Sequence, residues 1–73
     1  MADPAYNQAM EYIIVRISKS IKSATEFYCG GFGWDPNKAY AVRFATKKLA
    51  EQRIIDRGFN GGKHVEYKVR GVK

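Results

Sequence analysis

Residues 39–58 read AYAVRFATKKLAEQRIIDRG and contain the clearest helix signal in the chain. Thr46 is a favourable N-cap, because its hydroxyl can accept a hydrogen bond from a free amide in the first helical turn. Gly58 is a favourable residue after the last turn, because without a Cβ it can adopt the left-handed conformation that ends many helices. Arg53 and Arg57 would lie near the negative end of the helix dipole, where cations are favoured. We therefore expect a helix that begins after Thr46 and ends before Gly58.

Two strands are expected before this helix, at residues 10–18 and 25–29. Apolar β-branched residues alternate through the first of them, which is typical of a half-buried strand. The side chains that this alternation would turn toward the core are Ile13, Val15, Ile17 and Phe27. The side chains that it would turn toward an outer sheet face are Tyr12, Ile14, Arg16 and Tyr28.

Turn residues and one more strand account for the rest of the chain. Three glycines and an Asp-Pro-Asn turn at residues 30–37 are expected to break the sheet. There Phe32 and Trp34 would either cover one end of the core or form a stacking surface for a ligand. Residues 40–44 are expected to be an extended approach to the helix or a short third strand. Residues 64–70 alternate between apolar and polar side chains and predict the last strand.

The fold class that follows is α+β: a three- or four-stranded antiparallel sheet with one α-helix packed on one face, in the order ββ(β)αβ. The expected core is Ile13, Val15, Ile17, Phe27, Phe44, Ala50, Ile54, Val65, Tyr67 and Val69. On the helix, Ile55 falls opposite the core side, at about 100° of rotation per residue. It is the apolar residue that we expect on the outer helix surface.

A chain of 73 residues predicts one small domain, here residues 10–73. Residues 1–9 contain Pro4 and show no periodicity, so we interpret them as a mobile N-terminal arm. No apolar run is long enough to predict a membrane span or a signal peptide, and a cytoplasmic protein without a membrane partner is expected. We also expect a monomer when the chain is free.

Catalysis and cofactor binding are not expected. Acid–base or nucleophilic catalysis needs at least two groups within reach of one another. The chain has one His, His64, and one Cys, Cys29, with scattered carboxylates. These are also too few for a structural zinc site or a disulfide framework.

The net charge of +6 is unevenly spread along the chain. Up to Asp35 there are three Lys and Arg against four Asp and Glu, whereas from Pro36 there are ten against three. The positive charge therefore belongs to the helix and the last strand. Such a field favours a polyanion or an acidic protein surface as partner, although it can equally serve solubility.

Two binding hypotheses fit these observations. In one, the chain is a small basic nucleic-acid-binding module that stacks bases on an aromatic and cationic sheet face and contacts phosphates with its helix. In the other, it binds a larger protein through sheet edges, the arm and basic side chains. The expected partner-binding residues on the arm and outer sheet, which would supply specificity, are Tyr6, Tyr12, Ile14, Arg16 and Tyr28. The expected cations, which would speed association, are Arg43, Lys47, Arg53 and Arg57.

Residues 41–51, AVRFATKKLAE, resemble the helix start of small bacteriophage-encoded ββαβ proteins, which commonly show an Ala-x-x-Phe-x-Thr-x-x-x-Ala-Glu pattern. The resemblance extends over most of the chain from Met10. Its motif is structural, comprising a buried Phe, an N-cap and a small residue against the sheet. Length and basic character are similar to the RNA polymerase-binding transcription regulators of lytic Xanthomonas phages. The resemblance implies binding to the host polymerase, inhibition of initiation by displacement of sigma factor, and antitermination; it implies no role for any single residue.

Overall fold

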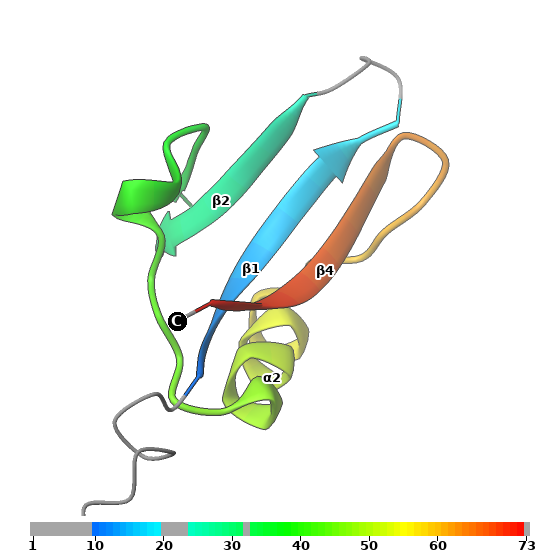
Figure 1. Cartoon of the computed structure of the whole chain (residues 1–73). Helices are drawn as coiled ribbons and strands as arrows, with labels where there is room; N and C mark the ends of the chain where they lie inside the picture. Colours follow the sequence, from blue (N-terminus) through cyan, green and yellow to red (C-terminus); the bar gives the residue numbers. More distant parts are fainter. Residues whose placement is uncertain (1–9, 20–23, 32, 73) are drawn as a thin grey trace, which may run out of the picture.

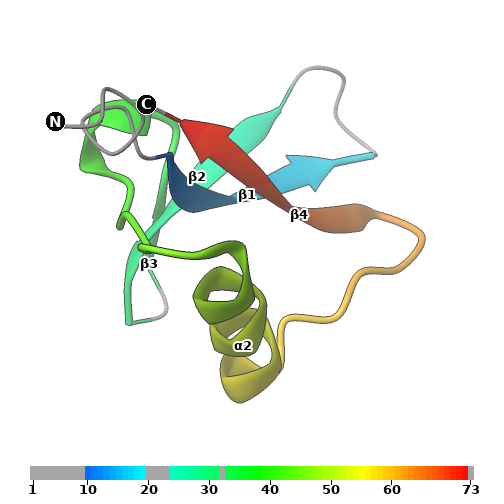
Figure 2. The same cartoon turned by 60° about the horizontal axis from the view of Figure 1, so that its bottom comes forward.

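The computed structural model describes residues 10–19, 24–31 and 33–72. The elements follow in the order β1 (Glu11–Ser18), β2 (Thr25–Gly30), β3 (Gly33–Asp35), the 3-10 helix η1 (Lys38–Tyr40), α2 (Lys47–Arg57) and β4 (Val65–Val72). The strands form one antiparallel sheet in the order β3-β2-β1-β4, of which Figure 1 labels β2, β1 and β4. Helix α2 lies against one face of this sheet (Figure 2). The α+β fold class expected from the sequence is confirmed.

Both ends of α2 lie where the sequence predicts them. The hydroxyl of Thr46 accepts a hydrogen bond of 3.1 Å from the backbone N–H of Leu49, which satisfies one of the free amides of the first turn. Gly58 has φ 70° and ψ 29°, and its N–H donates to the carbonyl of Ile55 at 3.0 Å. Local capping chemistry therefore fixes the length of the helix. In the part of the chain that the structure describes, no helix is long and apolar enough to cross a membrane.

Replacing Thr46 by Ala is expected to lower the free energy of unfolding by about 1 kcal/mol, because the first turn loses its side-chain acceptor. Lys48 lies two residues further along, is exposed, and provides a matched control. Lys48→Ala should change stability little. Urea titration of both variants measures the difference, and equal losses would show that the Thr46 cap does not stabilise the helix.

The third strand does not lie where the sequence suggested. Residues 40–44 form no strand, and within them only Phe44 pairs with the sheet, through a single bridge to Tyr12. The third strand is instead Gly33–Asp35, which pairs with β2 as β3. Gly30 and Gly31 have φ values of 109° and 56°, which residues other than glycine rarely adopt. These glycines therefore permit the tight turn into β3. The glycine-rich segment extends the sheet rather than ending it.

The sheet faces of β1 and β2 are the reverse of the predicted ones. Ile14 lies opposite Val69, and Tyr28 opposite Trp34. Residues opposite one another in antiparallel strands share a face. Val69 packs against the core cluster that contains Ile14 and Ala50 of the helix, so Ile14 faces α2. The prediction that Ile13 and Val15 face the helix is therefore wrong. The side chains that were expected to face the helix but lie on the opposite face are Ile13, Val15, Ile17 and Phe27.

The core consequently has two parts. The helix-side cluster is Ile14, Tyr28, Phe44 and Ala50, with Tyr12, Trp34, Val42, Ile54, Phe59 and Val69 packed against it. The opposite cluster is Ile13, Val15, Phe27 and Val72, with Ile17 and Ala41 packed against it. Phe44, Ala50, Ile54 and Val69 thus lie on the predicted side. A sheet this small uses both faces to bury apolar side chains.

Trp34 belongs to an aromatic cluster on the helix side of the sheet. Its ring contacts those of Tyr28, Phe59 and Tyr67, with centroids 5.1–5.6 Å apart. The guanidinium of Arg16 lies 4.6 Å from the centroid of the Trp34 ring. Trp34 therefore packs within a strand of the sheet instead of covering one end of the core. Phe32 lies outside the described residues.

Candidate functional site

Two of the predicted partner-binding residues are fully buried. Ile14 and Tyr28 are both 0% exposed, so neither offers a surface to a partner. The Tyr28 hydroxyl donates to the carbonyl of Gly31 at 2.9 Å and accepts from a guanidinium N–H of Arg53 at 3.2 Å. The expectation of an open aromatic sheet face is wrong, because the register with β3 and β4 turns this face toward α2.

Tyr12 and Arg16 share this helix-side face. Tyr12 is half-buried and packs against the helix-side cluster. Arg16 is half-buried, forms an ion pair with Glu26 and lies over the ring of Trp34. Both side chains therefore make contacts within the fold, and neither projects from an outer face as the sequence suggested.

The predicted cations have different surroundings. Arg53 is half-buried, and its guanidinium lies 5.6 Å from the centroid of the Phe44 ring, so it stabilises the aromatic core. Arg43 is exposed and pairs with Glu11 at 3.3 Å. Arg57 is half-buried in the last turn of α2, and Lys47 is exposed in the first. These cations therefore differ in their exposure and in their contacts, and Tyr6 lies outside the described residues.

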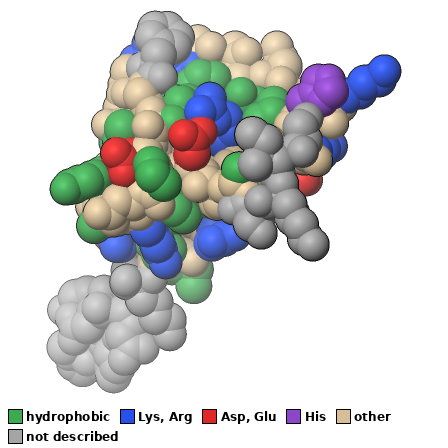
Figure 3. Space-filling model, turned by 90° about the horizontal axis from the view of Figure 1, so that it is seen from above, with side chains coloured by type: hydrophobic (Ala, Val, Ile, Leu, Met, Phe, Trp, Pro, Cys, Tyr) green, Lys and Arg blue, Asp and Glu red, His purple; other side chains and the backbone are tan. Residues whose placement is uncertain are grey.

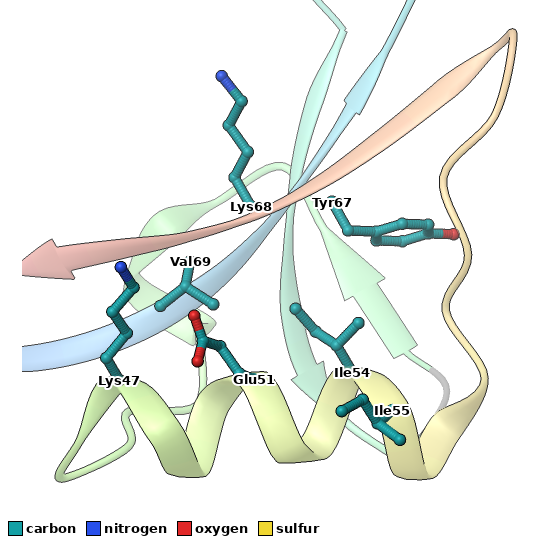
Figure 4. Close-up of a pocket in the computed structure, with 7 residues that line it drawn as sticks. All are labelled: Lys47, Glu51, Ile54, Ile55, Tyr67, Lys68 and Val69. Atoms are coloured by element: carbon teal, nitrogen blue, oxygen red, sulfur yellow. The ribbon is translucent and has the colours of Figure 1, made fainter.

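A groove runs between α2 and β4. Its volume is about 590 Å³, and it is lined by Lys47, Glu51, Ile54, Ile55, Tyr67, Lys68 and Val69. In Figure 4, Ile54 and Val69 point into the space between helix and strand, while Lys68 points away from the helix. Ile55 is 70% exposed, as predicted, and Leu49 is also exposed, at 53%. The groove thus combines apolar walls with three charged side chains, those of Lys47, Glu51 and Lys68.

Sequence reasoning named Lys47 as a binding residue and placed Ile55 on the outer helix surface, but it did not predict that the last strand completes a groove with them. Tyr67 and Val69 were expected to be covered by the helix, yet each is half-buried and lines the groove. The alternation of the last strand was a usable signal for which side chains face α2. The position of β4 at the edge of the sheet had no such signal, because strand order depends on tertiary pairing.

A second hollow, of about 480 Å³, lies on the same sheet face beyond α2. It is lined by Arg16, Ser18, Ala24, Glu26, His64, Val65 and Tyr67. Two opposite charges in its lining, Arg16 and Glu26, are paired with each other.

The structure does not bring Cys29 and His64 together. Residue 27 pairs with Val15, which places Cys29 near the start of β1, whereas the carbonyl of His64 accepts from Lys19 just beyond its end. At about 3.3 Å per residue along a strand, the two lie on the order of 20 Å apart. Among the described residues, no three His, Cys, Asp or Glu side chains cluster as metal ligands would.

Comparison of the chain with protein-family models, with curated proteins and with solved structures finds no match.

Proposed function

We propose that the chain is a protein-binding regulator of transcription that docks on bacterial RNA polymerase. The observation that carries this proposal is the groove between α2 and β4, where the exposed Ile55 and three half-buried apolar side chains lie beside Lys47, Glu51 and Lys68. Protein interfaces combine an apolar centre with a polar, charged rim. A positively charged rim suits an acidic partner surface and speeds its association.

The helix-start motif supports the same proposal. Phe44 is 8% exposed, Ala50 is fully buried and Thr46 caps α2, which are the structural roles that the resemblance to small phage ββαβ proteins implies. That resemblance suggests a phage-encoded protein that inhibits initiation and promotes antitermination in the cytoplasm of an infected bacterium. On this proposal the chain acts by binding, as a monomer, and needs neither a cofactor nor a catalytic group.

Direct nucleic-acid binding is the weaker candidate. Base stacking on the sheet requires accessible rings, but Tyr28 is fully buried and Tyr12 is packed against the core. On the face drawn in Figure 3, Lys and Arg side chains are scattered among hydrophobic ones rather than arranged as a continuous stripe. A groove that follows a phosphate backbone would need such a stripe.

The experiment that tests the proposal is affinity capture from a bacterial lysate after nuclease treatment, read by mass spectrometry. The full chain is expected to retain polymerase subunits, because protein contacts survive the loss of nucleic acid. Purified polymerase should then bind directly in the absence of DNA and RNA. If polymerase is lost after nuclease treatment, and the free chain binds DNA with an affinity that falls steeply as salt rises, the nucleic-acid hypothesis is correct instead.

A further inference from the structure

Among the residues that the structure describes, strand β4 pairs with β1 on one side and with no strand on the other. The carbonyl of His64 accepts from Lys19, so His64 and every second residue after it point their backbone groups toward β1. The residues between them point their N–H and C=O groups outward. The carbonyl of Val65 accepts from the N–H of Gly62 at 2.8 Å, whereas no described residue bonds to the outward groups of Tyr67, Val69 and Gly71.

The side chains of β4 divide between two environments. Tyr67 and Val69 lie on the helix side and form one wall of the groove (Figure 4). Lys68 and Arg70 lie on the opposite face of the sheet and are exposed. Glu66 shares that face and lies 3.7 Å from the Lys68 ammonium. Arg70 forms no ion pair with another residue of the described ranges, so its charge is available to a ligand.

We propose that this edge binds an extended, acidic segment of the partner protein by strand addition. The backbone of the segment would bond to the outward groups of Tyr67, Val69 and Gly71. Alternate side chains of an added strand fall on opposite faces. Apolar side chains would therefore enter the groove beside Ile54, and the acidic ones between them would lie next to Lys68 and Arg70. This inference rests on the proposed function and specifies the contact.

Charge favours such a segment over a second copy of the chain. Two copies that each carry a net charge of +6 repel one another, whereas an acidic strand is attracted. Charged side chains on an edge strand also discourage pairing between identical edges. Within the groove, Glu51 would repel an acidic side chain, so the apolar positions of the added strand must point inward and the acidic ones outward.

The probe is a short, blocked peptide that alternates Asp and Val. Its control is a peptide of the same composition in which all Asp residues precede all Val residues, since this arrangement cannot separate charge and apolar groups onto two faces. Binding is measured by fluorescence anisotropy at fixed salt. The alternating peptide should bind at least about tenfold more tightly, the change that about 1.4 kcal/mol produces. Amide exchange should slow at Tyr67, Val69 and Gly71, which become hydrogen-bonded.

Charge reversal tests the outer face of the same strand. The double variant Lys68→Glu with Arg70→Glu should bind the alternating Asp-Val peptide about tenfold or more weakly than wild type does. It should bind an alternating Lys-Val peptide more tightly instead. The matched control is Lys38→Glu with Lys48→Glu, which makes the same change of net charge at exposed positions outside the groove. Circular dichroism verifies that both variants remain folded.

Each contrary outcome identifies a different error. Equal binding of the two peptides, or slowed exchange elsewhere in the chain, overturns strand addition. Slowed exchange at the same three amides in the free chain, dependent on its concentration, shows that a second copy is the occupant. If polymerase is retained equally by wild type and by the Lys68 and Arg70 variant, the inference fails while the proposed function stands. If wild type retains no polymerase but binds the peptide as described, the proposed function fails and the edge site stands.

Discussion

Replacing Phe44 by Ala is expected to lower the free energy of unfolding by about 3–5 kcal/mol. The ring is 8% exposed and stacks on Tyr28 with centroids 6.4 Å apart, and the guanidinium of Arg53 lies over it. A small side chain here would leave a cavity at the junction of β1, β2 and α2. The total free energy of unfolding of a domain of this length is roughly 4–11 kcal/mol, so the variant should be close to unfolding at ambient temperature.

Thermal and urea unfolding of Phe44→Ala measure this loss, with Leu49→Ala as the control. Leu49 lies in the next element but is 53% exposed, and its truncation should cost far less. The backbone of Phe44 also exchanges two hydrogen bonds with Tyr12, of 2.8 and 2.9 Å, which the substitution leaves in place. A Phe44→Ala protein that melts at nearly the wild-type temperature would show that the ring does not hold α2 on the sheet.

The features predicted correctly from the sequence are those set by local chemistry. Thr46 and Gly58 each act within one turn of the helix end, so neither depends on the rest of the fold. The alternation of Tyr67 and Val69 likewise identified the helix side of β4. Features that depend on pairing between distant segments had no comparable signal.

The third strand illustrates this limit. β3 is three residues long, too short for its periodicity to be recognised. What stabilises it is the turn at Gly30 and Gly31 together with the pairing of Trp34 with Tyr28. From sequence alone the same glycines indicate a break in the sheet just as well as a hairpin.

The candidate site was missed for a related reason. Lys47 belongs to the groove, but its other wall exists because β4 lies outside β1 at the edge of the sheet. The aromatic residue Tyr28 was chosen for an outer face that turned out to be the core. Identifying a binding surface on so small a domain required knowing which face of the sheet the helix covers.

That face was ambiguous because Ile13, Ile14 and Val15 are consecutive apolar residues. A period of two cannot select a core side when both alternating sets are apolar. The structure buries all three completely, and the register with Val69 decides which of them contacts the helix side. A substitution can test this assignment directly.

Ile14→Ala is expected to lower the free energy of unfolding by about 2–5 kcal/mol, because a fully buried side chain is lost from the helix-side cluster. Ile17→Ala is the matched control, since it makes the same chemical change on the same strand at a half-buried position of the opposite face. Ile17→Ala should lower the free energy of unfolding by a clearly smaller amount. Urea titration with a common slope compares the two variants. An outer position for Ile14 would reverse the order, with Ile17→Ala the more damaging change, and would return Tyr28 to the accessible face.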